Sequence, residues 1–555
     1  MIDPVVTTGS PEGSKGERAT ARAAHAILWV DGEIEFLRAH IRYLEQRGYA
    51  VDRASSLATA MDMLRGCPYA LVLLDEQTLG KEGASTLHRI RAACPARVPL
   101  LLVSKADEER ASTTERARDI DGFIGKPVNP VQLLAACRAA LLAKADRTDA
   151  ATSAYVRARQ DIRTTLLASP SPANWEKIHF QISKWDITVD ASGDAGLLDT
   201  HTRHRRDLGR AFLGYIEDHY AGWVGKKGGN PDLHTSTVRR KLLPVLQRRA
   251  PAALVVLSGL RFDQWLVMQK KIEPWFKVEN AAAWALLPTE ADFCRAALFS
   301  GELPRDISLD QPQLWARLTG ASPETAEAGD DDDEFRDDQT ACLRELLRIQ
   351  LRKLKAGIDD PKFLRVRSRA DSLGLADALK AHADAPLVVV VVEMMDLLRP
   401  ERPDACVPLE PGLSEAGVRD AAASAFEQCG LVAALKTLAA QKRTVVLTAD
   451  HGSVRAETPA EVFCQEEQSE HPRVKIGPNI SCDERQALFI EAPERFGLPG
   501  VEGDTAYAIA KDRFYFAYPN KYQYFVTPYK ERMVSGGISP EEVVVPLATL
   551  TPKAG

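Results

Sequence analysis

The sequence has no long hydrophobic run, no excess of positive charge and no paired cysteines. Its longest apolar run, residues 386–392 (PLVVVVV), is far shorter than the roughly 20 residues of a membrane span and predicts a buried strand. The formal net charge of −6 gives no support for a nucleic-acid-binding face. Residues 1–25 lack the apolar core of a signal peptide, so we expect a disordered tail there. These absences predict a cytoplasmic protein without membrane insertion or nucleic-acid binding.

Three more absences narrow the function. The nine cysteines show no CxxC pair or repeated spacing, so we expect reduced thiols in a reducing compartment. The acidic run at 328–338 (AGDDDDEFRDD) lacks the spacing and glycine of an EF-hand, which favours a solvated loop over a calcium site. No helix-turn-helix pattern is present, so a DNA-binding regulator is a weak hypothesis.

The pattern of strands and helices predicts several α/β domains. At 555 residues the chain exceeds the size of a single hydrophobic core. Between residues 26 and 145, five short apolar runs alternate with amphipathic helical stretches, which predicts a five-stranded parallel sheet with helices on both faces. The expected strands are 26–30, 49–54, 70–74, 98–103 and 122–125.

The rest of the chain predicts a helical spacer followed by a second α/β domain. Residues 146–248 have little β-patterning, and stretches 153–168, 195–220 and 235–248 look helical. Residues 249–555 return to strands separated by helices. The expected strands there are 253–258, 386–393, 443–450, 486–492 and 542–550.

Four polar residues follow successive strands of the first domain. Asp31 ends the first expected strand and Asp75 the third, while Ser104 and Lys126 end the last two. Functional groups of an open α/β sheet gather at the carboxyl ends of its strands. An aspartate nucleophile, a hydroxyl and an ammonium together can support phosphoryl transfer to a carboxylate.

Residues 26–145 resemble a flavodoxin-like response-regulator receiver. The resemblance implies that Asp75 accepts the phosphoryl group, that Ser104, Lys126 and Phe123 form the switch, and that Asp31 and Asp75 hold Mg²⁺. Receivers present two adjacent acids after the first strand, whereas Gly32 stands at the second position, so we expect weakened Mg²⁺ binding. A receiver-shaped module that serves only for docking or dimerisation is the alternative.

The second α/β domain resembles a PglZ domain of the alkaline phosphatase superfamily. With the receiver and the spacer, it gives the chain the organisation of PorX-type response regulators. The segments that carry the likeness are LSGLRFDQW (257–265), LLPTEADFCRAALFSGELP (286–304), EMMDLLRPE (393–401), LTADHGS (447–453) and SGGISPEEVVVPL (535–547).

The resemblance implies a two-metal phosphatase site from which most groups are missing. Enzymes of this kind clamp the phosphoryl group between two metal ions and use an activated hydroxyl nucleophile. The family's nucleophile position is Ala291, and its ligand positions include Ser258, Pro400 and Ser535. The surviving positions are Asp396, Asp450 and His451, a vestigial site that suits at most one Zn²⁺.

The residues therefore favour a regulator without phosphatase activity. We expect phosphorylation by a sensor histidine kinase, homodimerisation on phosphorylation, and an output that binds an unknown protein effector or a ligand. The alternative is an active metal-dependent phosphodiesterase or phosphatase with a rebuilt metal site, in which Thr289 or Ser258 replaces the missing nucleophile.

Overall fold

The computed structural model describes most of the chain, which divides into two compact units. One unit comprises residues 1–161 with 188–201, and the other comprises 162–187 with 202–555. The described residues are 26–66, 69–79, 87, 90–91, 98–104, 120–225, 231–320, 332–398, 407, 409, 411–464, 471–500 and 505–553. The expected tail at 1–25 lies outside them.

The first unit contains a five-stranded parallel sheet, which confirms the expected fold. Strand order is β2-β1-β3-β4-β5, and every neighbouring pair is parallel. Three central strands are buried along their whole length because apolar residues face both layers of helices. The strands are β1 (Ala26–Val30), β2 (Ala50–Ala54), β3 (Leu71–Asp75), β4 (Leu100–Ser104) and β5 (Gly122–Gly125). Helical elements are η1 (Ile34–Leu37), α2 (Arg38–Glu45), α3 (Leu57–Gly66) and η2 (Glu76–Leu79).

Three long helices follow the sheet: α6 (Pro130–Leu167), α7 (Pro172–Ser192) and α8 (Ala195–Val224). The stretch expected to be helical at 235–248 is helical, but in three short pieces rather than one α-helix. The pieces are a short turn η4 (His234–Ser236), a π-helical segment η5 (Val238–Leu242) and α9 (Leu243–Gln247). Pro244 lies in the first turn of α9 and has no N–H for the helical ladder, so one continuous α-helix cannot form.

The second unit is built on a six-stranded sheet of order β7-β19-β10-β6-β9-β8. Strands β10, β6, β9 and β8 are parallel, whereas β19 runs antiparallel to both of its neighbours. The strands are β6 (Ala252–Leu257), β7 (Phe276–Trp284), β8 (Lys362–Val366), β9 (Leu387–Val392), β10 (Thr444–Thr448) and β19 (Val544–Pro552). The strand expected at 542–550 begins late, because Ser539 caps the short helix α21 (Pro540–Val543).

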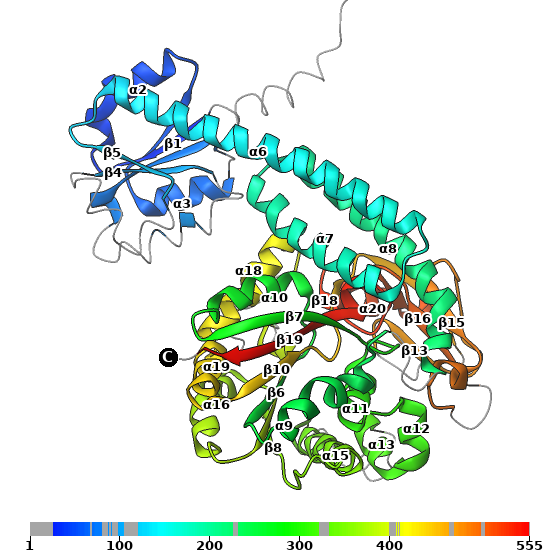
Figure 1. Cartoon of the computed structure of the whole chain (residues 1–555). Helices are drawn as coiled ribbons and strands as arrows, with labels where there is room; N and C mark the ends of the chain where they lie inside the picture. Colours follow the sequence, from blue (N-terminus) through cyan, green and yellow to red (C-terminus); the bar gives the residue numbers. More distant parts are fainter. Residues whose placement is uncertain are drawn as a thin grey trace, which may run out of the picture. The chain divides into compact units, whose positions relative to one another are not determined.

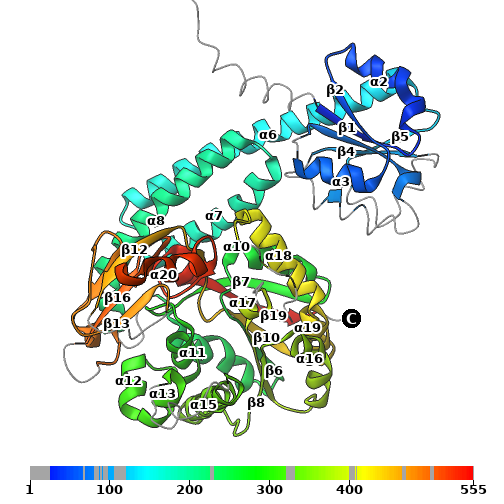
Figure 2. The ribbon, with the colours of Figure 1, turned by 180° about the vertical axis from the view of Figure 1, so that it is seen from behind.

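Helices cover both faces of this sheet. Figures 1 and 2 show α10, α16, α18 and α19 on one face, and α9, α11 and α15 on the other. Their bounds are α10 (Phe262–Met268), α11 (Ala291–Ser300), α12 (Pro304–Asp310), α13 (Pro312–Thr319), α15 (Asp332–Lys353), α16 (Arg369–Ala381), α17 (Met394–Leu398), α18 (Glu415–Gln428) and α19 (Leu431–Ala440). The loop expected at 328–338 is wrong from Asp332 onward, where acidic residues begin α15, as the positive end of a helix dipole favours.

Short strands form a separate layer of the second unit. They make sheets β13-β16-β15, β14-β12-β17 and β11-β18 near α20 (Figure 2). Their bounds are β11 (Val454–Arg455), β12 (Thr458–Phe463), β13 (Val474–Gly477), β14 (Ser481–Cys482), β15 (Ala487–Ile490), β16 (Ala506–Ala510), β17 (Phe514–Ala517), α20 (Tyr522–Tyr529) and β18 (Met533–Val534).

Two bulk expectations can be compared with the structure. Within the described residues, none of the helices is both long enough and apolar enough to cross a membrane. The expectation of free thiols is wrong for Cys429, which is disulfide-bonded at the end of α18. Cys137, Cys294, Cys342, Cys464 and Cys482 are free.

Candidate functional site

The receiver site lies at the carboxyl edge of the parallel sheet. Asp31 directly follows β1, Asp75 ends β3, Ser104 ends β4, and Lys126 follows β5. Both carboxylates and the serine are buried. Parallel strands bring their carboxyl ends to one edge, so residues far apart in the sequence come together there.

Lys126 joins the two aspartates. Its Nζ lies 2.7 Å from Asp75 Oδ1 and 3.8 Å from Asp31 Oδ2. Burial alone would lower the pKa of Lys126, but the hydrogen bond to Asp75 and the two negative charges raise it. Burial raises the pKa of Asp31, and so does the nearby Asp75 charge. The site is therefore an ammonium held between two crowded carboxylates.

The other side of Asp75 is held by Thr78. The backbone N and Oγ1 of Thr78 both donate to Asp75 Oδ2 at 3.1 Å. The Gly32 N donates in turn to Thr78 Oγ1 at 3.0 Å. A Cβ built at Gly32 would lie 3.8 Å from that oxygen, an ordinary contact, so the position has room for the missing acid.

The remaining switch residues are placed beside this pair. The Ser104 hydroxyl donates a short hydrogen bond to Glu76, the residue that follows Asp75. Phe123 is half-buried on β5 and packs against the apolar core under the sheet. The sequence reasoning did not single out Glu76 or Thr78, although both follow Asp75 directly in a tight turn.

The phosphatase-like site begins where β10 ends. Asp450, His451 and Gly452 follow that strand, and all three are buried. A Cβ at Gly452 would lie 1.8 Å from the Glu541 carbonyl oxygen, so only glycine fits there. This close approach explains the glycine without any metal, because it brings the strand end against α21.

Asp450 has hydrogen-bond donors on both oxygens. The N–H groups of His451 and Gly259 donate to its Oδ1 at 2.8 and 3.3 Å. Arg295 Nε donates to its Oδ2 at 2.6 Å. Burial would raise the pKa of Asp450, but the charges of His451 and Arg295 and these hydrogen bonds hold it well below its usual value.

Arg295, on α11, reaches three strand ends. Besides Asp450, it donates through Nη2 to Ser258 Oγ at 2.8 Å and through Nη1 to Glu393 Oε1 at 2.7 Å. Arg365 on β8 also donates to Glu393, at 2.9 Å. Despite burial, the charges of Glu393 and Asp450 raise the pKa of Arg295 further above its ordinary value. Sequence reasoning missed Glu393 and Arg365, although a charged residue directly after the buried β9 was a usable signal.

The positions expected to be substituted lie at strand ends, at a helix start and beside a glycine pair. Ser258 follows β6 and its hydroxyl accepts from Arg295, while Ala291 is the first residue of α11. Ser535 is half-buried beside a glycine pair whose backbone meets Thr289: the Thr289 hydroxyl donates to Gly537 O at 2.7 Å and accepts from Gly536 N at 3.1 Å. The Asp396 side chain and the whole of Pro400 lie outside the described residues.

These residues do not fit the family's two metal ions. In the part of the chain that the structure describes, His, Cys, Asp and Glu form no group of three or more that could hold a metal. Asp450 is saturated by donors, and Ser258 faces a guanidinium. His451 Nδ1 lies 2.8 Å from the Gly452 carbonyl oxygen and its Nε2 lies 3.7 Å from Asp450. The expected set of Asp396, Asp450 and His451 is not shown.

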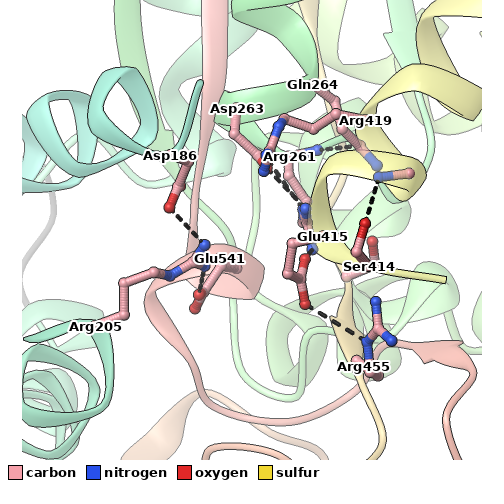
Figure 3. Close-up of polar contacts among 12 residues, drawn as sticks. Asp186, Arg205, Arg261, Asp263, Gln264, Ser414, Glu415, Arg419, Arg455 and Glu541 are labelled. Atoms are coloured by element: carbon pink, nitrogen blue, oxygen red, sulfur yellow. Dashed lines mark hydrogen bonds and ion pairs between the residues drawn. The ribbon is translucent and has the colours of Figure 1, made fainter. Parts of the chain in front are cut away.

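A second buried ionic cluster connects helices α7 and α8 to the same domain (Figure 3). Arg205 on α8 pairs with Asp186 on α7 at 2.8 Å and with Glu541 on α21. Burial would raise the pKa of Glu541, but Arg205 and other nearby cations lower it to about 2. Glu541 precedes Glu542, whose carboxylate holds the loop at Gly537 through a 2.9 Å hydrogen bond.

The rest of this cluster is formed by the RFDQW segment. Arg261 pairs with Asp263 at 2.7 Å and with Glu415 on α18 at 2.8 Å. Arg419 pairs with Asp263 and Arg455 with Glu415 (Figure 3). Arg513 also pairs with Glu415. Breaking a buried pair leaves a charge without a partner, so we expect these residues to hold the scaffold.

The described domains match three known families. Residues 27–138 match the response regulator receiver domain, 147–224 the PorX response regulator linker domain, and 408–550 the BREX system PglZ alkaline phosphatase-like domain. The chain is therefore a response regulator that carries a PglZ domain. The succession of receiver, PorX linker and PglZ domain places it among the PorX-type response regulators.

Individual relatives resemble the receiver part. The chain is 29% identical over 123 residues to the uncharacterized transcriptional regulatory protein YkoG of Bacillus subtilis, which covers 22% of this chain and 54% of YkoG. The chain thus spans about half the length of that regulator. A response regulator of Burkholderia pseudomallei, solved with a phosphorylated aspartic acid, shows 23% identity and a TM-score of 0.19 over 20% of this chain and 65% of its own. A magnesium-bound receiver domain of a Pseudomonas aeruginosa sensor histidine kinase shows 17% identity and a TM-score of 0.19. The match covers 21% of this chain and 98% of that receiver domain.

Proposed function

We propose that this response regulator is phosphorylated on Asp75 by a sensor histidine kinase. Asp75 is the nucleophile: its carboxylate attacks the phosphorus of the kinase's phosphohistidine, so an acyl phosphate forms as the P–N bond breaks and the imidazole leaves. Lys126 neutralises the developing charge, and Ser104 turns from Glu76 to the phosphoryl oxygens. The 2.7 Å contact between Lys126 and Asp75 supports these roles.

Asp31 and Asp75 are the residues that would hold Mg²⁺, since two neighbouring carboxylates match the oxygen ligands it prefers. Bound there, the ion would supply charge neutralisation for the incoming phosphoryl group. Gly32 offers no side-chain ligand, so Mg²⁺ binding is weaker than with two adjacent acids. Phosphorylation then shifts a conformational equilibrium of the regulator and favours a homodimer.

The PglZ domain is a non-catalytic output that binds a protein effector or a ligand. One observation carries this conclusion: Asp450, the retained family ligand, is neutralised by the buried guanidinium of Arg295. Both hydroxyls nearest to replacing the nucleophile are engaged, Ser258 by Arg295 and Thr289 by the glycine loop. The ionic cluster around Arg205 and Glu541 supports a role for α7 and α8 in positioning this domain.

Two assays on the full chain test the proposal. Incubation with acetyl phosphate and Mg²⁺ should add one phosphoryl group, measured by intact mass, and Asp75→Asn should abolish the addition. The same protein with added Zn²⁺ should not hydrolyse bis(p-nitrophenyl) phosphate above the rate of an Asp450→Asn control. Turnover that this substitution removes would establish the alternative, a rebuilt metal-dependent phosphodiesterase. Unchanged labelling of Asp75→Asn would overturn the assignment of Asp75 as the phosphoacceptor.

A further inference from the structure

We propose that Arg295 is the built-in cation of the PglZ site, a positioning residue that does the structural work of a metal ion. The inference rests on the proposed non-catalytic function and explains how the domain keeps its shape. The observation is a single guanidinium in contact with the ends of three neighbouring strands.

The sheet order makes this position special. Strands β10, β6 and β9 are adjacent, and Asp450, Ser258 and Glu393 follow them in turn. Arg295 contacts a side chain at each of these ends, at 2.6, 2.8 and 2.7 Å. A metal ion bound to strand-end ligands would connect the same three strands. The guanidinium of Arg295 can therefore make this connection in place of a metal.

The two carboxylates that Arg295 contacts already have cationic partners. Asp450 and Glu393 supply two negative charges, and Arg295 and Arg365 supply two positive charges. The side chain of Asp450 is fully buried and that of Arg295 is 4% exposed. A divalent cation would add positive charge beside two guanidinium groups in a buried site, which disfavours its binding. The wild-type site should therefore reject Zn²⁺.

The shape of arginine is essential to the arrangement. All three guanidinium nitrogens donate: Nε to Asp450, Nη1 to Glu393, and Nη2 to Ser258 and Glu393. Lysine carries the same charge but as a point, and it cannot present this planar set of donors. Charge and geometry can thus be separated by comparing Arg295→Lys with Arg295→Ala.

Removal of Arg295 should let a metal ion supply the missing positive charge, even though the described residues form no group of three ligands. Asp450 and Glu393 would then be two buried carboxylates without Arg295. His451 lies beside Asp450, with its Nε2 3.7 Å from Asp450 Oδ1 and its Nδ1 at the Gly452 carbonyl. Two carboxylates and an imidazole are ordinary zinc ligands.

Thermal unfolding of the full chain in EDTA and in excess Zn²⁺ tests the inference. Wild type should unfold at the same temperature in both. Arg295→Ala should unfold at a clearly lower temperature in EDTA and regain part of the loss with Zn²⁺, because a ligand that binds only the folded state stabilises it. The unfolding temperature of Arg295→Lys in EDTA should lie between those of wild type and Arg295→Ala. Zn²⁺ should raise it less than it raises that of Arg295→Ala. A wild-type midpoint that Zn²⁺ raises and EDTA lowers would overturn the inference, as would an Arg295→Ala midpoint equal to wild type in EDTA.

Calorimetric titration of the wild-type chain with Zn²⁺ keeps the inference testable if Arg295→Ala does not fold. Absence of binding supports it, and stoichiometric binding that Asp450→Asn removes contradicts it. Failure of this inference can be distinguished from failure of the proposed function. Zn²⁺ binding without phosphodiester turnover overturns only the role of Arg295. Turnover without Zn²⁺ binding overturns only the non-catalytic function.

Discussion

The two units of this chain each place a basic side chain against strand-end carboxylates, but they do so in opposite ways. In the receiver, Lys126 is 18% exposed and bridges two aspartates through a flexible stem. In the second unit, Arg295 is 4% exposed and contacts residues at the ends of three strands. An ammonium at the surface can change partners when a phosphoryl group arrives, whereas a saturated, buried guanidinium has no reason to move.

One chain can thus hold a receiver site with a partly exposed cation and a second site that is occupied by a buried arginine. Lys126 is itself partly exposed at the carboxylate edge. Arg295 removes the charge imbalance that would attract a metal. Substitutions at the two cations should therefore have opposite consequences for signalling and for stability.

The largest effect is expected from Arg295→Met compared with Lys126→Met. Removing Arg295 leaves buried Asp450 without its main cation, which should cost about 3–5 kcal/mol of unfolding free energy in the PglZ unit. Removing Lys126 should destabilise the receiver less, because Lys126 is 18% exposed and its loss disrupts no buried charge network of comparable size, while abolishing Asp75 phosphorylation. Denaturant unfolding followed separately in each unit, with acetyl phosphate labelling, measures both. Equal destabilisation by the two changes would break the comparison.

Acid should destabilise the PglZ unit through its buried neutral histidines. Burial lowers the pKa of His179 and His234 to about 4 and that of His471 to about 3, from an ordinary value of 6.5. The unfolded chain then binds more protons than the folded one between pH 6.5 and about 4. Stability is therefore full above pH 6.5 and falls with decreasing pH, by on the order of 3 kcal/mol per histidine.

His234→Leu isolates one of these contributions. The groups that act on His234 are Asp450, His451 and the Ala449 carbonyl. Between pH 6.5 and 4 the unfolding free energy of the variant should decline less than that of wild type, by about the contribution of one histidine. Denaturant titration at each pH measures this decline. An unchanged decline would show that His234 is not held neutral by burial.

The smallest effect is expected from restoring the missing acid of the receiver. Gly32→Asp should raise Mg²⁺ affinity roughly tenfold, because a third carboxylate joins Asp31 and Asp75. The space beside Thr78 accommodates the new side chain. Calorimetric titration with Mg²⁺ measures the change, and Gly32→Asn is the matched control without charge. Equal affinities for both variants would mean that Gly32 does not limit metal binding.

The positions of the four receiver residues could be predicted because a parallel sheet imposes them. Once Asp31, Asp75, Ser104 and Lys126 follow successive strands, topology brings them together. The contacts of Thr78 and Glu76 depend on the turn after β3, which no pattern of hydrophobic residues reveals. The same holds for Pro540–Val543, where a cap at Ser539 overrides an apolar run that looks like a strand.

For the phosphatase-like site, the sequence could predict which family residues are substituted but not which contacts take their place. Motif comparison identifies Ser258, Ala291 and Ser535 as substitutions, but it says nothing about what replaces the lost groups. The Arg295 contacts join residues 37, 98 and 155 positions apart in the sequence. Such pairs follow from the order β10-β6-β9 and from the packing of α11 on the sheet, not from local sequence.

The zinc content of the wild-type chain, purified without chelators from zinc-supplemented cells, tests the central claim most directly. Elemental analysis should find zinc well below one ion per chain, because Arg295 already neutralises the site. Two zinc ions per chain, or one that Asp450→Asn removes, would contradict the claim and show that the PglZ domain has kept its metal.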